Sequence, residues 1–183
     1  FAEVRPQFDR DKEKLEMNIV FQIGEAPRVY VERVQINGNT LGNHYTLTKL
    51  RWIKDHQPEL YERAAYFLNW TGCVAFMLGA EPAVDYSIAN RTLFFDINAE
   101  TWSDELLAAA GLEADRLARP VPSHTVVGTV APHMAADLGL PPGVQIAIGA
   151  HDQCANAVGC GVLNPGQAAY GMGTYHCIAP VFT

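Results

Sequence analysis

The spacing of apolar residues divides the chain into a short β-rich beginning and a longer part in which helices and strands alternate. From about residue 44 onward, helical spacing predicts helices near 46–56, 58–65, 70–79, 102–110, 131–138 and 153–160. Short apolar runs predict strands near 92–97, 144–149, 167–172 and 175–181. A chain organised in this way is expected to adopt an α/β fold.

Alternating apolar and polar positions predict three strands in the first forty residues. They are Val4 to Phe8, Leu15 to Ile23, and Arg28 to Asn37, with charged residues 9–14 and residues 24–27 as turns. This stretch holds 13 charged residues, against 20 in the remaining 143, and all four cysteines lie in the remainder. We therefore expect an N-terminal antiparallel β segment that is distinct from the rest.

A candidate catalytic carboxylate follows the apolar run of residues 144–149. The run leads through Ala150 and His151 to Asp152, and small residues then favour a helix. An aspartate between a buried strand and a helix is held rigidly, and the free helix N–H groups stabilise its charge. This placement suits a general base, but taken alone the stretch favours an ordinary helix N-cap over a base. His151, beside Asp152, could tune the environment of the carboxylate, but a neighbour in sequence is expected to point elsewhere, which favours a structural role.

A glycine-rich turn follows shortly after this helix. Two β-like runs flank Gly171-Met172-Gly173-Thr174, where glycines let backbone N–H groups approach an anion and the threonine hydroxyl adds a donor. An ordinary hairpin would also use glycines to bend. Such turns can hold phosphate, and a strand-Asp-helix followed closely by a strand-Gly-Thr-strand is much rarer than either motif alone.

Together these motifs resemble the FGGY carbohydrate kinases, which share the ribonuclease-H-like fold of the actin-like ATPases. The resemblance rests on residues 149–153, the small-residue helix after them, the Asn-Pro-Gly turn at 164–166, and the Gly-Thr hairpin. It implies that Asp152 takes the proton from a sugar or polyol hydroxyl as that hydroxyl attacks the γ-phosphate of ATP. It further implies that Gln153 holds the substrate and that Gly173 and Thr174 meet the phosphates. Mg²⁺ is expected with the ATP, with no metal site formed by the protein alone.

Upstream segments extend this resemblance from about His44 to Thr183. They are a Lys-x-x-Trp helix that leads into a Pro-Glu helix, an Asp-x-Ser-x-Ala loop at 85–89, and a Trp-x-Asp helix from 102. By this resemblance Tyr45 is a candidate sugar contact. Several upstream residues also have plain structural interpretations: a solvated helix face for Lys49 and Arg51, core packing for Trp52 and Trp102, and a turn for Asp85.

Residues 1–40 resemble a different family, the POTRA repeats of the bacterial outer-membrane barrel-assembly factor. The similarity is clearest from Arg28 to Thr40 and covers the end of one repeat and the start of the next. We therefore expect two pieces, a POTRA-like fragment at 1–40 and a partial FGGY first domain at 44–183, with a seam near Thr40 to Asn43. Two alternatives to a kinase stay open: a module that binds extended peptides by β-augmentation, and a non-functional chimera.

An FGGY kinase is expected to carry two features that this sequence does not show. One is an Asp-x-Gly-Thr phosphate loop on an initial β-hairpin, and the other is a second domain that holds the adenine. The expected fold is therefore a partial ribonuclease-H-like domain. Phosphoryl transfer requires both lobes around the γ-phosphate, so the chain alone is expected to show little or no activity.

The composition of the chain argues against some classes of binding partner. A net charge of −7 without a basic tract argues against nucleic acid, and the longest apolar stretch, near 71–80, is too short to span a bilayer. The four cysteines lack metal-ligand spacing and are expected to be free, buried thiols. The expected partner is a small sugar or polyol, whose identity the sequence does not specify. A cytoplasmic location is expected for the kinase part and a periplasmic one for the parent of the POTRA-like part, and a homodimer is open for a complete kinase.

Overall fold

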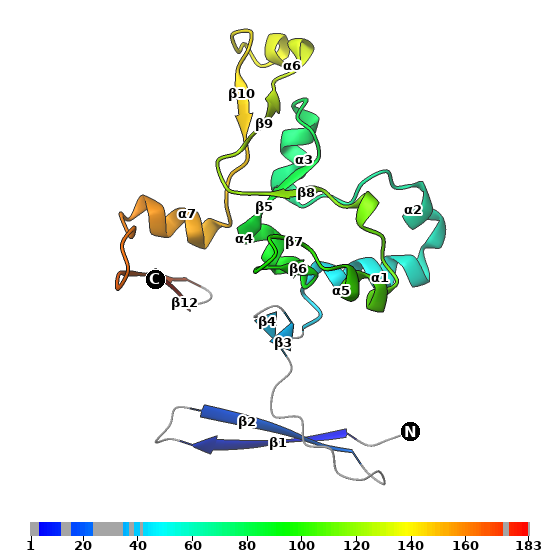
Figure 1. Cartoon of the computed structure of the whole chain (residues 1–183), viewed down its shortest axis with the longest axis vertical. Helices are drawn as coiled ribbons and strands as arrows, with labels where there is room; N and C mark the ends of the chain where they lie inside the picture. Colours follow the sequence, from blue (N-terminus) through cyan, green and yellow to red (C-terminus); the bar gives the residue numbers. More distant parts are fainter. Residues whose placement is uncertain are drawn as a thin grey trace. The chain divides into compact units, whose positions relative to one another are not determined.

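The computed structural model describes residues 4–11, 16–23, 35–36, 39–40, 42–173 and 176–182. The chain separates into two compact units, Phe1–Leu41 and Gly42–Thr183. Figure 1 shows both, with the first unit in blue. The two units do not by themselves show that the chain combines two protein families, so the domain assignment made from the sequence stays a prediction.

The first unit contains antiparallel hairpins. Strand β1 (Val4–Asp11) pairs with β2 (Glu16–Ile23) over the full length of both, and β3 (Gln35–Ile36) pairs with β4 (Asn39–Thr40). The expected antiparallel segment is thus confirmed, but β1 continues to Asp11, through residues expected to form a turn. Of the third predicted strand, residues 28–34 and 37 lie outside the described residues.

Helices of the second unit agree closely with the pattern of the sequence. They are α1 (Thr46–His56), α2 (Pro58–Arg63), α3 (Trp70–Met77), α4 (Tyr86–Ala89), α5 (Asp104–Ala110), α6 (Pro132–Asp137) and α7 (Asp152–Gly159), with 3₁₀ turns η1 (Asn90–Thr92) and η2 (Ala114–Arg116). Pro58 and Pro132 lie in the first turns of α2 and α6, where a missing N–H costs no helical bond. All six predicted helices are present, and α4 was not predicted.

The strands of the second unit form two-stranded pairs among the described residues. They are β5 (Ala83–Asp85), β6 (Phe95–Asp96), β7 (Thr101–Trp102), β8 (Arg119–Val121), β9 (Val126–Thr129), β10 (Gln145–Ala147), β11 (Ala168–Met172) and β12 (His176–Pro180). Strands β5 and β8 pair in parallel, whereas β6–β7, β9–β10 and β11–β12 are antiparallel. The strand predicted near 92–97 is shorter than expected, because Thr92 ends η1 and Leu93 takes a left-handed conformation with φ of 74°.

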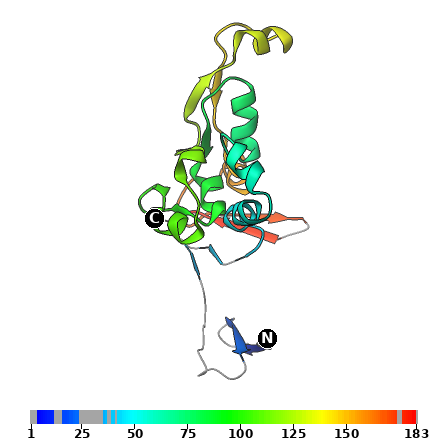
Figure 2. The same ribbon diagram turned by 90° about the vertical axis from the view of Figure 1, so that its right-hand side faces the viewer.

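One core cluster anchors the strand that leads to the candidate site. It contains Ala75, Ala80, Ala83, Val121, Val127, Val130, Ala135, Ile146 and Ile148. Ile146 and Ile148 point into it, so β10 is fixed just before residue 149. Figure 2 shows β9 and β10 extending together, with α6 at their far end. Because these buried side chains leave little freedom, the position where β10 ends is well defined.

Two further clusters pack α1, α2 and α5 and the region around β5. Trp102 lies between them, against Phe94 and Phe95, and its Nε1 donates to the Ala118 carbonyl at 3.0 Å, so its predicted core role is confirmed. The same prediction for Trp52 is wrong, since this ring is 51% exposed and stacks on His56. Trp52 follows the inward-facing Leu50 by two positions, which places it off the buried face of α1.

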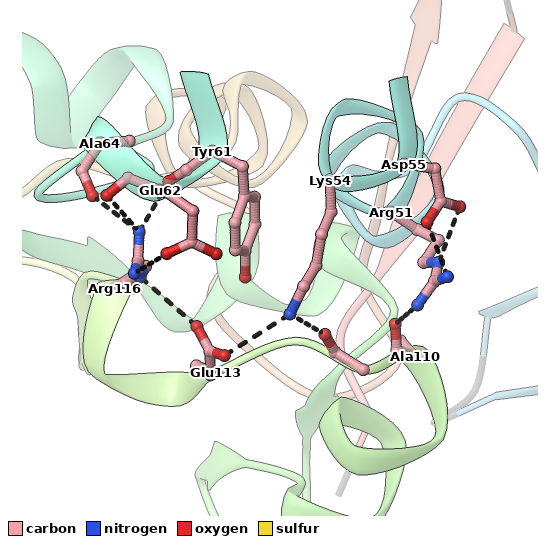
Figure 3. Close-up of polar contacts among 10 residues, drawn as sticks. Arg51, Lys54, Asp55, Tyr61, Glu62, Ala64, Ala110, Glu113 and Arg116 are labelled. Carbon is pink, nitrogen blue, oxygen red and sulfur yellow. Dashed lines mark hydrogen bonds and ion pairs between the residues drawn. The ribbon is translucent and has the colours of Figure 1, made fainter. Parts of the chain in front are cut away.

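Charged side chains join α1 and α2 to the segment after α5 (Figure 3). Lys54 donates to the Gly111 carbonyl at 2.6 Å, and Arg116 pairs with Glu62 at 2.8 Å. Lys49 is exposed as expected, but Arg51 does more than face solvent. It pairs with Asp55 at 2.7 Å and donates to the Ala110 carbonyl at 3.1 Å.

Candidate functional site

Asp152 lies at the start of α7, immediately after the turn that leaves β10. The cap of this helix is His151, with ψ of 138°, and Asp152 occupies the first helical position. The N-cap alternative for Asp152 is therefore wrong by one residue. The carboxyl group remains next to the N–H groups of the first turn of α7.

The contacts of Asp152 leave one carboxyl oxygen open. Oδ1 accepts from the Gln153 N–H at 2.8 Å and lies 3.0 Å from Nδ1 of His151. The Asp152 side chain is 82% exposed, and none of its contacts among the described residues uses Oδ2. A carboxylate held at one oxygen and open at the other can accept a proton from a hydroxyl that approaches from solvent.

The His151 side chain contradicts its expected orientation. Its Nδ1 accepts from the Gln153 N–H at 3.3 Å and faces Asp152 at the distance given above. Because the ring turns back to cap the helix, two consecutive side chains meet at the same N–H. The side chains of His151 and Asp152 therefore form a polar pair at the start of the helix, an arrangement that was not expected from the sequence.

Gln153 and the glycine hairpin come together in the structure. A Cβ added to Gly171 would lie 2.9 Å from Oε1 of Gln153, so the amide packs against β11 where a side chain is absent. Gly173 is exposed at the bend after β11. Thr174 lies outside the described residues. Two of the predicted phosphate and substrate residues, Gly173 and Gln153, are thus on adjoining elements.

Tyr45 occupies a different environment. It is the residue before α1 and is 5% exposed. Its ring packs against the His44 ring, and the Arg91 guanidinium lies over it, 5.7 Å from the centroid of the Tyr45 ring. Its carbonyl accepts from the Thr48 hydroxyl at 2.9 Å. These described contacts do not join it to the Asp152 turn, and its role as a sugar contact stays a prediction.

Asp85 and Ser87 reach the candidate site from β5 and α4. Asp85 is fully buried and caps α4 through Oδ2, which accepts from the Ile88 N–H at 3.1 Å. Ser87 donates to the same oxygen and accepts from the His151 N–H at 2.8 Å. The turn predicted for Asp85 is present, because its carboxyl group caps α4. The link to α7 joins Ser87 and His151, which are 64 positions apart, and no local sequence pattern indicates it.

An apolar pocket of about 440 Å³ adjoins the turn without including Asp152. Its lining comes from α3 and the end of β10: Trp70, Thr71, Val74, Ala75, Leu78, Ile146, Ala147, Ile148 and Gly149. The pocket offers apolar contact and few polar groups, so it does not by itself indicate a sugar site.

The cysteines are free thiols, and the described residues form no cluster of metal ligands. All four cysteines are free, as expected, but Cys154 and Cys160 are exposed and the other two are half-buried, so the expected burial is wrong. Within those ranges, no group of three or more His, Cys, Asp or Glu side chains could hold a metal ion. No helix there is long and apolar enough to cross a membrane.

Comparison with known proteins identifies relatives of the chain. It is 33% identical over 141 residues to the xylulose kinase of Bacillus subtilis (strain 168), covering 77% of this chain and 28% of that protein. It is 33% identical over 161 residues to the autoinducer-2 kinase of Escherichia coli (strain SMS-3-5 / SECEC), covering 82% and 30%. The chain therefore spans about three-tenths of the length of these relatives.

Solved structures show the same relationship. The fold is similar to a kinase from Brucella ovis described as a xyloylose kinase, with a TM-score of 0.73, 30% identity, and coverage of 78% of this chain and 30% of that one. The xylulose kinase from Rhodospirillum rubrum matches with a TM-score of 0.68 and 30% identity over 73% of this chain and 28% of that one. The expected α/β fold of the actin-like ATPases is confirmed by these matches.

A family model adds the boundaries. Residues 17–159 match the N-terminal domain of the FGGY family of carbohydrate kinases. The match begins inside the stretch that resembles POTRA repeats, so that resemblance gains no support. Since the matched region covers most of the sequence, the chain belongs to the FGGY family of carbohydrate kinases.

Proposed function

We propose that the protein to which this chain contributes phosphorylates a hydroxyl group of a sugar or polyol with ATP, and that Asp152 is the general base. The observation that carries this proposal is the geometry of the Asp152 carboxyl group. One oxygen is held at the start of α7, and the other is open in an exposed side chain. Membership of a kinase family supplies the reaction class for which such a base is needed.

The proposed step is a direct transfer. As the substrate oxygen attacks the γ-phosphorus of ATP, its O–H bond breaks and the proton passes to Oδ2 of Asp152, while the bond from phosphorus to the bridging oxygen breaks and ADP leaves. At the start of α7 the Gln153 N–H donates to Oδ1 of Asp152 at 2.8 Å, which leaves Oδ2 to receive the proton. Positioning and charge stabilisation provide most of the catalysis in phosphoryl transfer, and a well-placed base adds about 10²–10⁴-fold.

Gln153 and Gly173 are assigned supporting roles. The Gln153 amide, packed over Gly171, would orient a substrate hydroxyl beside Asp152, while the exposed backbone at Gly173 would approach the phosphates. Thr174 is proposed as a further phosphate donor, and Tyr45 as a more distant sugar contact. A magnesium ion would be held mainly by ATP oxygens and water, because the described residues offer no ligand cluster.

Phosphoryl transfer is expected to need more than this chain provides alone. A hybrid in which residues 42–183 replace the matching part of the Bacillus subtilis xylulose kinase tests the assignment. We expect ADP to form from ATP only when a ketopentose, a hexitol or glycerol is added, and the chain alone to show little turnover. Sugar-independent ADP formation by the hybrid would argue against a carbohydrate kinase. Turnover by the chain alone that Asp152→Asn removes would contradict only the expectation that further segments are needed.

A further inference from the structure

A chain of hydrogen bonds connects the residue before Asp152 to a buried carboxyl group. The His151 N–H donates to Ser87 Oγ at 2.8 Å, and the Ser87 hydroxyl donates in turn to Oδ2 of Asp85. The serine thus uses its proton toward Asp85 and a lone pair toward His151. Such chains polarise each member, so each bond strengthens the next.

Asp85 is suited to be the fixed end of this chain. It ends β5, which pairs with β8, and it caps α4 through the Ile88 N–H. Its Oδ1 is buried and has no hydrogen-bond partner among the described residues. Both described donors, the Ser87 hydroxyl and the Ile88 N–H, therefore converge on Oδ2. Removing the Ser87 hydroxyl would leave this buried carboxyl group with one described donor.

The turn that donates this hydrogen bond is open around Gly149. No atom lies within 4 Å of the position where a Cβ on Gly149 would stand, and Asp152 is exposed. The hydrogen bond to Ser87 comes from His151, the last residue of the turn before the helix. It is not needed to cap α4, because Asp85 already accepts the Ile88 N–H.

We propose that Ser87 is a positioning residue for Asp152. Its hydroxyl holds the His151 N–H at a fixed place beside the β5–α4 corner, and this fixes the first turn of α7 and the carboxyl group it carries. The catalytic meaning of this placement rests on the proposed function of Asp152. Misplacement of a catalytic group by about 1 Å can cost about 10²-fold in rate, so such a restraint has a direct functional value.

Amide hydrogen exchange in the whole 183-residue chain, followed by NMR, tests the proposal without ATP or sugar. In the wild type, the His151 amide should exchange at least about tenfold more slowly than its intrinsic rate. Ser87→Ala should remove this protection and shift the Gln153 amide proton, which reports the bond to Asp152 Oδ1. Ser87→Thr, which keeps a hydroxyl, should restore both signals.

Ser103→Ala is the matched control, because Ser103 caps α5 by accepting from the Leu106 N–H at 3.3 Å. It should speed exchange at Leu106 and leave His151 unchanged. Exchange of the wild-type His151 amide at its intrinsic rate would overturn the proposal without any variant. An unmoved Gln153 signal in Ser87→Ala would also overturn it, as would a loss of protection in both α5 and α7 of that variant. A Ser87→Thr variant that restores neither signal would overturn it too. The exchange signals do not depend on kinase activity. They can therefore support the positioning role of Ser87 even if the kinase assay fails, so the two proposals are tested separately.

Discussion

The guanidinium of Arg116 donates a 2.6 Å hydrogen bond to the carbonyl of Tyr61 and lies over the ring of the same residue, 5.2 Å from its centroid. The same nitrogen also reaches the carbonyls of Glu62 and Ala64 at 3.0 and 3.4 Å. Figure 3 shows Arg116 beside the end of α2, where the last carbonyls of a helix have few backbone donors. One side chain therefore caps α2 and ties it to η2.

Replacing Arg116 with alanine should lower the free energy of unfolding by about 2–3 kcal/mol, because several carbonyls lose a charged donor in a largely buried setting. Arg116→Lys should recover part of this, since lysine cannot serve the same carbonyls with a planar fork. Urea unfolding of the chain measures both.

The matched control for that change is Arg119→Ala. Arg119 pairs with Glu81 at the surface, with both side chains more than half exposed, so its loss should cost less than about 1 kcal/mol. Equal losses for the two arginines would show that the cap on α2 contributes nothing beyond a surface ion pair.

Gly72 marks the place where α3 approaches β5 most closely. A Cβ there would lie 2.5 Å from the Ala83 carbonyl oxygen, which belongs to the backbone and cannot move aside easily. Gly72→Ala should therefore destabilise the chain by about 1–3 kcal/mol, despite the better helix propensity of alanine.

Gly159→Ala supplies the comparison, because Gly159 ends α7 with no atom within 4 Å of its added Cβ. It should be neutral or stabilise by up to about 1 kcal/mol. Thermal unfolding followed by circular dichroism separates the two. A lower melting temperature for Gly159→Ala than for Gly72→Ala would contradict the packing described for α3.

Partial burial raises the pKa of the Tyr86 hydroxyl above its ordinary value of 10.0, and the charge and hydrogen bond of Glu100 raise it further. The folded chain then holds this proton more tightly than the unfolded chain does. The associated stability is present below pH 10 and is lost as the pH rises through the raised pKa.

Unfolding at about pH 8 and again above pH 10 should show wild type losing stability relative to Tyr86→Phe, which has no proton to release. In a Glu100→Gln background this relative loss should shrink. A pH-independent difference between wild type and Tyr86→Phe would rule out the raised pKa.

Local pattern predicted the helices of the second unit, but not its strand pairing. Six helices followed from apolar spacing, whereas β5 and β8 have three residues each and pair across more than thirty positions. Such short strands lack a period, and a proline such as Pro120 in β8 is uncommon within a strand. Leu93 in a left-handed conformation likewise depends on the surrounding packing, so the strand expected there is reduced to two residues.

The candidate site was predictable as a location but not as a geometry. A strand, a lone carboxylate and a small-residue helix placed Asp152 correctly at the start of α7. The contacts of the His151 ring, the fit of Gln153 over Gly171, and the hydrogen bond from the His151 N–H to Ser87 arise from tertiary structure and leave no periodic signal. Resemblance to a family supplied the chemistry proposed for Asp152, and packing determines how its side chain is held.

The kcat of Asp152→Asn tests the central claim most directly, measured with ATP and saturating ketopentose in the hybrid kinase that carries residues 42–183. Asparagine keeps the size of the side chain and cannot accept the proton, so we predict a loss of at least about 10²-fold. Asp137→Asn, at an exposed aspartate that ends α6, should stay within about twofold of the unmodified hybrid. An Asp152→Asn hybrid with the kcat of the Asp137→Asn hybrid would contradict the assignment of Asp152 as the base.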